Sequence, residues 1–222
     1  KVSGGYDDLK EQTIAGFPTD NYPDLVLAYP DHVADYLDYN KAADITPYME
    51  HPDYGWTEDD FDDVVPSFLE EGQSYSVEGT YSLPFCKSTE GMFYNATLLI
   101  GLNLAAVDPT INDGKPLTAA YINSLTWDEL FNKLCPALIE YNEKADAKAK
   151  ILDTSGNDWA VVGYDSDDNL FITLAEQYGL PYTDIVETTG KGQALWNTPE
   201  MKDLMRTFNH AKNNHYFMTK GT

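Results

Sequence analysis

The stretch that decides the predicted fold is Pro23-Asp24-Leu25-Val26-Leu27-Ala28-Tyr29-Pro30-Asp31-His32. Residues 25–29 form an almost wholly apolar run, which is typical of a strand buried on both faces of a parallel sheet. A helix with Val33, Tyr36 and Leu37 on one face follows at once. Ligands of open α/β sheets bind outside the carboxyl ends of strands, so this junction is a predicted binding position.

Short apolar runs alternate with helical patterns along the rest of the chain, which indicates an α/β architecture. Further strands are predicted at residues 81–85 and 159–164. One helix start is especially clear, because Thr126 and Glu129 have the spacing of a capping box. Helices are predicted from Tyr6 to Ile14, from Thr57 to Gly72, from Thr126 to Pro136, from Leu170 to Tyr178 and from Pro199 to Phe208.

The composition is that of a folded, acidic chain. Of its 222 residues 42% are hydrophobic and 13% aromatic, and 14 Lys and Arg stand against 37 Asp and Glu, for a net charge of −23. This charge repels phosphate backbones, so nucleic acid is not an expected partner. No apolar run reaches membrane-spanning length. Cys86 and Cys135 lie far apart without a CxxC pattern, so both are predicted to be free thiols.

Sequence motifs of catalysis and cofactor binding are absent. No nucleophile elbow, zinc-protease helix or phosphate-binding loop occurs, and the four histidines lack metal-ligand spacing. Residues 165–169 have the acidic character of a calcium loop but lack its central glycine and its terminal glutamate. We therefore expect neither a cofactor nor a metal. A glycoside hydrolase that uses paired carboxylates remains an alternative, because the sequence does not show the distance between two acids.

Four stretches, in order along the chain, resemble the family 1 extracellular solute-binding proteins of bacterial ABC transporters, of the sugar-binding, maltose-binding-protein-like kind. They are residues 23–32, 81–95, 126–130 and 163–171. The resemblance implies a two-lobed α/β fold of the periplasmic-binding-protein class II, with the first crossing between lobes near residues 84–94. It places the N-terminal lobe at residues 1–87 and the C-terminal lobe at residues 88–222. The family's first strand and helix are expected before Lys1 and its return crossing after Thr222, so the chain is expected to be truncated at both ends.

The same resemblance implies a binding function and no enzymatic activity. A sugar or oligosaccharide is expected in the cleft between the lobes, for delivery to the permease subunits of an ABC transporter. The protein is expected to be a monomer that is extracellular or periplasmic, or held at the cell surface by a lipid anchor outside this chain. An alternative solute is glycerol phosphate or another small molecule, although only Lys87 among the candidate residues would favour a phosphate.

A sugar site needs carboxylates and amides beside aromatic rings. The predicted ligand-binding residues come from three turns and are Tyr29, Asp31 and His32, then Ser88, Thr89 and Glu90, and finally Asp165, Ser166 and Asn169. Two of these turns equally fit plain helix caps, at Asp31 and at residues 165–166. Tyr164, Phe171 and Trp196 are further candidates for stacking, with Phe171 also fitting a core position. The prediction requires that the turns near residues 31 and 165 face one another.

Overall fold

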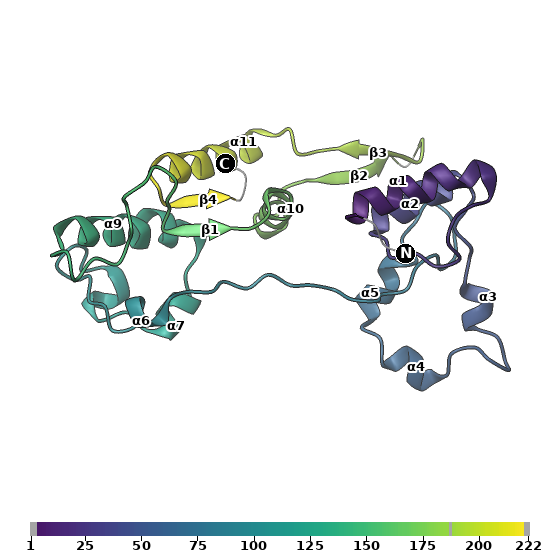
Figure 1. Ribbon diagram of the computed structural model, residues 1–222, viewed down its shortest axis with the longest axis horizontal. Helices are drawn as coiled ribbons and strands as arrows, with labels where there is room; N and C mark the ends of the chain where they lie inside the picture. Colours follow the sequence, from purple (N-terminus) through teal and green to yellow (C-terminus); the bar gives the residue numbers. More distant parts are fainter. Residues whose placement is uncertain (1–3, 187, 220–222) are drawn as a thin grey trace. The chain divides into compact units, whose positions relative to one another are not determined.

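The computed structural model describes residues 4–186 and 188–219 and divides the chain into two compact units. Unit 1 is Lys1–Glu90 and unit 2 is Gly91–Thr222 (Figure 1). Both helices and strands are present, in agreement with the predicted mixed α/β class. The boundary at residues 87 and 88 and the class II arrangement of two lobes stay predictions.

Unit 1 is helical within its described residues and contains no strand there. Its core is small, with Phe17, Val33, Tyr36 and Met49 as the buried hydrophobic side chains. The rings of Phe17 and Tyr36 meet edge to face at 5.8 Å between centroids. The elements are α1 (Tyr6–Gly16), the 3-10 helix η1 (Phe17–Thr19), α2 (Pro30–Asp38), α3 (Thr46–Met49), α4 (Glu58–Asp62) and α5 (Pro66–Glu71).

Unit 2 combines helices with two small sheets. Its elements are α6 (Ala96–Leu99), η2 (Ile111–Gly114), α7 (Ala119–Asn123), α8 (Trp127–Glu129), the π-helical turn η3 (Leu130–Leu134), α9 (Cys135–Lys144), β1 (Val162–Tyr164), α10 (Asp167–Gln177), β2 (Thr183–Val186), β3 (Lys191–Ala194), α11 (Pro199–Asn213) and β4 (Phe217–Thr219). Strands β1 and β4 pair in parallel, and β2 and β3 form an antiparallel hairpin. Helix α11 leads into β4 and lies beside it (Figure 1).

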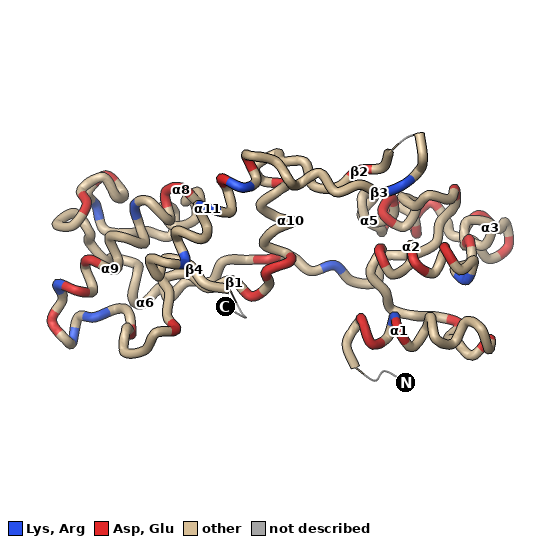
Figure 2. Tube along the Cα trace, turned by 90° about the horizontal axis from the view of Figure 1, so that it is seen from above, with Lys and Arg blue, Asp and Glu red and all other residues tan. Residues whose placement is uncertain are grey.

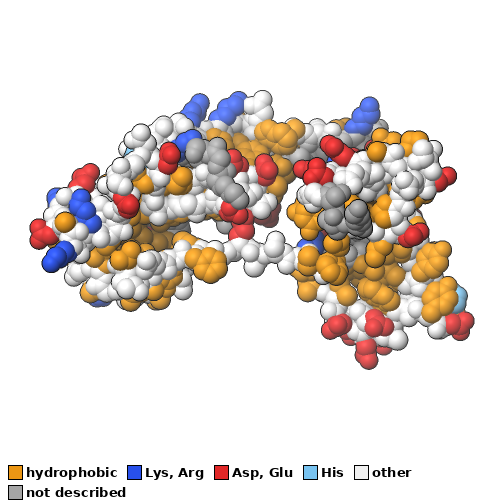
Figure 3. Space-filling model, viewed as in Figure 1, with side chains coloured by type: hydrophobic (Ala, Val, Ile, Leu, Met, Phe, Trp, Pro, Cys, Tyr) orange, Lys and Arg blue, Asp and Glu red, His pale blue; other side chains and the backbone are white. Residues whose placement is uncertain are grey.

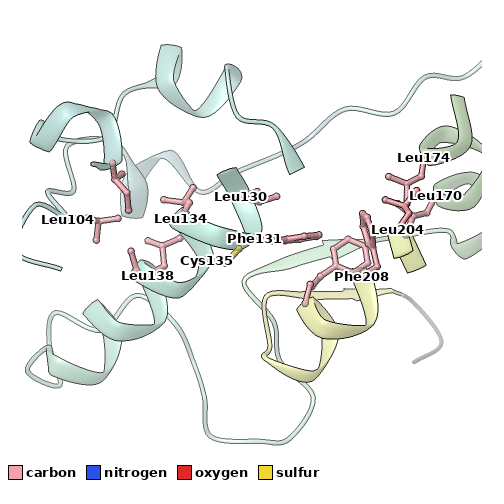
Figure 4. Close-up of a cluster of buried hydrophobic side chains, with 14 of the residues drawn as sticks. Leu104, Leu130, Phe131, Leu134, Cys135, Leu138, Leu170, Leu174, Leu204 and Phe208 are labelled. Atoms are coloured by element: carbon pink, nitrogen blue, oxygen red, sulfur yellow. The ribbon is translucent and has the colours of Figure 1, made fainter. Parts of the chain in front are cut away.

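The core of unit 2 is a continuous cluster, most of which η3, α9, α10, α11 and β4 supply (Figure 4). Leu104, Ile111 and Leu117, from the segment before α7, complete it. Its aromatic centre consists of Phe131, Phe208 and Phe217, whose ring centroids are 5.1–5.8 Å apart. Trp127 packs against all three rings. Cys135 is fully buried in this core, and burial raises the pKa of its thiol to about 12. Both cysteines are free thiols, and Cys86 is exposed.

Most of the predicted helices are confirmed. Helices α1, α2, α10 and α11 lie where the apolar periodicity places them. The capping box is present, because the Thr126 hydroxyl accepts from the Glu129 amide at 3.2 Å while the Glu129 carboxylate accepts from the Thr126 amide. The predicted end at Pro136 is wrong, because the helical path continues through η3 into α9 and ends at Lys144. Pro136 stands in the first turn of α9, where its missing N–H is tolerated.

Two predicted strands and one long helix are wrong. Residues 25–29 and 81–85 are irregular, and Leu25 is 91% exposed, whereas the prediction buried it. A strand is stable only beside a hydrogen-bonding neighbour, and no described strand pairs with either segment. The helix predicted from Thr57 to Gly72 divides into α4 and α5, and Pro66, the first residue of α5, keeps Val65 out of the helical conformation.

The strands of unit 2 also differ from the prediction in extent. The strand predicted at residues 159–164 is confirmed only as β1. The β2–β3 hairpin and β4 have no counterpart in the prediction. Each of these strands is three or four residues long, which is too short for a period-two pattern to stand out.

Candidate functional site

The first turns of α1 and α2 bring together aromatic and acidic side chains that the sequence separates by more than twenty residues. Tyr6 and Tyr29 pack with ring centroids 4.5 Å apart. Tyr29 meets the imidazole of His32 edge to face at 5.4 Å. Asp7 and Asp31 flank this imidazole. We call these five residues the Tyr–His cluster.

Local sequence chemistry fixes the two helix starts. Tyr29 is the extended N-cap residue of α2, and Pro30 supplies the preset φ of the first helical position. At the start of α1 the Gly5 amide donates to the Asp8 carboxylate at 2.8 Å. An ion pair between Lys10 on α1 and Asp35 on α2, with 2.5 Å between Nζ and Oδ2, links the two helices. Figure 2 shows the acidic residues gathered along both of them.

His32 is the buried polar group of the cluster, with a side chain only 3% exposed. Its Nε2 lies 3.7 Å from Asp7 Oδ1 and 3.9 Å from Asp31 Oδ2. Both distances are longer than a hydrogen bond. Its Nδ1 is buried and has no hydrogen-bond partner among the described residues. The Nε2 edge of the imidazole therefore faces two carboxylates, and the ring packs against the ring of Tyr29.

The outer part of the Tyr–His cluster faces solvent. The Asp7 and Asp31 side chains are 95% and 75% exposed. Tyr6 and Tyr29 are about half exposed. Two carboxylates that accept hydrogen bonds thus stand beside two aromatic rings that offer apolar surface. This combination suits a ligand with hydroxyl groups and an apolar C–H face.

Comparison with known families decides the wider identity. Residues 1–222 match the model of a family described as bacterial extracellular solute-binding protein. The chain belongs to this family. No curated protein matches its sequence. Membership indicates an extracellular or periplasmic location and the binding of a small-molecule ligand for transport.

The remaining predicted site residues of this solute-binding protein lie elsewhere. Ser88, Thr89 and Glu90 are exposed in an irregular segment at the end of unit 1. At the start of α10 in unit 2, the Ser166 hydroxyl accepts from the Asn169 amide at 3.2 Å, so the cap interpretation of that turn is confirmed. Asp165 precedes the cap and is exposed. That the turns near residues 31 and 165 face one another stays a prediction.

Tyr6 and Asp7 are the members of the solute-binding protein's cluster that the sequence does not reveal. The apolar periodicity assigns Tyr6 to the buried face of a helix, yet its ring is 44% exposed and contacts Tyr29. The contact depends on how α1 packs on α2, and no pattern within either helix encodes that packing.

Metal binding and membrane insertion find no support in the described ranges 4–186 and 188–219 of the solute-binding protein. No three His, Cys, Asp or Glu side chains there converge closely enough to hold a metal ion. In the same residues no helix combines the length and the apolar character that crossing a bilayer requires.

Proposed function

We propose that the protein binds a sugar or oligosaccharide outside the cytoplasm and delivers it to the permease of an ABC transporter. The observation that carries this proposal is the Tyr–His cluster, in which the Tyr6 and Tyr29 rings lie beside the carboxylates of Asp7 and Asp31. Family membership supports the transport role. The family is described as one of solute-binding proteins, so we expect the ligand to be released without chemical change.

The charges of the cluster favour a neutral solute. Besides His32, its acid–base side chains are the carboxylates of Asp7 and Asp31 and the two tyrosine phenols, and the nearby Lys10 is paired with Asp35. A carboxylate accepts hydroxyl protons, and hydrogen bonds to a charged group contribute about 1.5–3 kcal/mol. A phosphate would instead meet like charge at Asp7 and Asp31. A sugar therefore fits this surface better than glycerol phosphate does.

We further propose that units 1 and 2 correspond to the two lobes of a class II binding protein, with lobes at residues 1–87 and 88–222. Hinge closure around the ligand is the usual response of such proteins. Ligand contacts from Ser88, Thr89 and Glu90 and from Asp165, Ser166 and Asn169 belong to this proposal. So do the monomeric state and attachment to the cell surface by a lipid anchor.

A panel of neutral mono- and oligosaccharides tests the proposal, with thermal unfolding and calorimetric titration as readouts. A ligand that binds only the folded state raises the melting temperature by mass action. Asp31→Asn and Tyr29→Ala are each expected to weaken binding about tenfold, the equivalent of one such hydrogen bond or ring contact. Tyr48→Ala is the matched control, since Tyr48 is an exposed tyrosine of unit 1 outside the cluster.

Two results would contradict the proposal. One is a melting temperature that no sugar of the panel raises. The other is an affinity for the sugar that is the same in the Asp31→Asn and Tyr29→Ala variants as in the Tyr48→Ala control. Release of new reducing ends from a bound oligosaccharide would instead support the hydrolase alternative.

A further inference from the structure

Unit 2 contains an open groove between α10, the residues that follow β3, and α11. Its volume of about 670 Å³ is within the range of small-molecule sites, about 300–1,000 Å³. The groove combines aromatic rings, amides and cations. The residues that supply them are Phe171, Trp196, Asn197, Lys202, Arg206 and Asn209.

The aromatic wall of the groove is held in place by mutual packing. Trp196 lies 5.4 Å from Tyr182 and 6.2 Å from Phe171 between ring centroids. Phe171 and Tyr182 are 5.9 Å apart. Trp196 nevertheless remains 39% exposed, so part of its indole is available to a ligand. A fixed, partly exposed indole is a suitable platform for the apolar face of a sugar ring.

The cations of the groove stand one helical turn apart on α11. Lys202 and Arg206 have the i, i+4 spacing that places two side chains on one face of a helix. Lys202 has no ion-pair partner among the described residues. Figure 3 shows Lys and Arg side chains beside hydrophobic ones over this helix. Arg206 is the only arginine of the sequence.

The Asp203 carboxylate forms an ion pair with the Nη1 atom of the Arg206 guanidinium. A guanidinium has five N–H donors in a fixed planar arrangement, so an ion pair at one of its nitrogens leaves donors for a second acceptor. Asp203 therefore restricts the guanidinium without using its full capacity. Amide groups of Asn197 and Asn209 line the same groove and both donate and accept hydrogen bonds.

We propose that this groove is a second carbohydrate-binding site, specific for a sugar that carries a carboxylate group. The sugar ring packs on Trp196, its hydroxyls bond to the two asparagine amides, and its carboxylate binds Arg206 and Lys202. The charge is the opposite of that in the Tyr–His cluster, so the two sites select different ligands. Because the chain has a net charge of −23, an anion is repelled over most of the surface, and these two neighbouring cations offer it a favourable position.

Titration of the whole chain with glucuronate, and separately with glucose, tests the site by calorimetry and by tryptophan fluorescence, to which Trp196 contributes as one of four tryptophans. Glucuronate is expected to bind at least about tenfold more tightly than glucose. Arg206→Gln and Lys202→Gln should each weaken glucuronate binding about tenfold, the effect of one lost charge-assisted bond. Lys212→Gln, on the same helix but outside the groove, is the matched control and should change nothing.

Equal binding of glucose, glucuronate binding that survives both substitutions, or no glucuronate binding at millimolar concentration would each overturn the proposal. Circular dichroism of every variant shows whether α11 stays folded. Asp31→Asn, in the Tyr–His cluster, should leave glucuronate binding unchanged. This variant separates a failure of the groove from a failure of the transport function proposed above.

Discussion

At the scale of single residues, Asn142 gives unit 2 a buried polar connection. Its side chain is almost fully buried on α9. The carboxamide oxygen accepts from the amides of Ile151 and Leu152, both at 2.8 Å, and the nitrogen donates to the Leu152 carbonyl at 3.2 Å. One side chain thus supplies hydrogen bonds to the loop that follows α9.

Asn142→Ala is expected to reduce the free energy of unfolding by about 3 kcal/mol, because it leaves partly buried backbone groups without partners. Urea unfolding followed by circular dichroism measures the effect. Asn132→Ala is a suitable control, since Asn132 is exposed and donates only to Asp128 on the surface. Equal stability of the two variants would contradict the assigned role of Asn142.

Asp44 has a comparable role in unit 1. Its carboxylate accepts from the Thr46 amide at 2.9 Å and from the Thr80 amide at 3.1 Å. Hydrogen bonds from the Thr46 hydroxyl, the Thr46 amide and the Thr80 amide hold the pKa of this carboxyl below its ordinary value of 3.8. The charged form is therefore favoured by folding.

This lowered pKa predicts how the stability of unit 1 depends on pH. A carboxyl whose pKa is lower in the folded state contributes stability above its unfolded pKa and loses it as the pH falls through the folded value. The difference in unfolding free energy between wild type and Asp44→Asn should be constant near neutral pH and shrink below pH 3.8. Urea unfolding across this range measures it, and a difference that is the same at every pH would contradict the prediction.

Three of the five residues of the Tyr–His cluster are among the predicted ligand-binding residues, and their binding of a ligand stays a prediction. Asp31, His32 and Tyr29 were predictable, since they stand where an apolar run meets a helix start, and the helix is present even though the strand is not. Tyr6 and Asp7 were not, because their role depends on the packing of α1 against α2.

At the scale of elements, helices were far more predictable than strands. A helix satisfies most of its backbone hydrogen bonds within itself. The residue just before the helix often caps it, as Thr198 does for α11 and Ser166 for α10. A strand depends on a partner that lies elsewhere in the chain. This explains why the apolar residues 25–29 form no strand while the short β1 and β4, which pair with each other, do.

The capping box of α8 allows a test at this scale. Thr126→Ala removes the hydroxyl that accepts from the Glu129 amide and should lower the free energy of unfolding by about 1 kcal/mol. Thr126→Ser keeps the hydroxyl and should lower it much less. Thermal and urea unfolding measure both variants. If Thr126→Ser lowers the free energy of unfolding as much as Thr126→Ala does, the hydroxyl cap contributes nothing to stability.

At the scale of the whole molecule, the two units differ in the amount of core that they bury. The continuous hydrophobic cluster belongs entirely to unit 2, from Leu104 to Phe217. Unit 1 buries only a few hydrophobic side chains and exposes others such as Leu25 and Phe85, and hydrophobic atoms are visible over much of the face in Figure 3. The free energy gained by burial is therefore concentrated in unit 2.

A fragment of residues 91–222 is accordingly expected to fold alone, whereas residues 1–90 alone should unfold at much lower urea concentration. Cooperative unfolding and dispersed amide resonances of the longer fragment are the measurements. Limited proteolysis of the full chain should cleave first in the irregular, exposed residues 85–93 and release this fragment intact. A longer fragment without cooperative unfolding would show that unit 2 needs unit 1.

Because the chain has a single arginine, the groove on α11 can be labelled by a reagent selective for arginine. Dicarbonyl reagents such as phenylglyoxal condense with guanidinium groups, and this chain offers them one target, Arg206. The adduct therefore forms at a known residue, and mass spectrometry of the intact chain measures the fraction of molecules that carry it. An occupant of the groove would shield that position, so the rate of labelling reports occupancy without any variant of the protein.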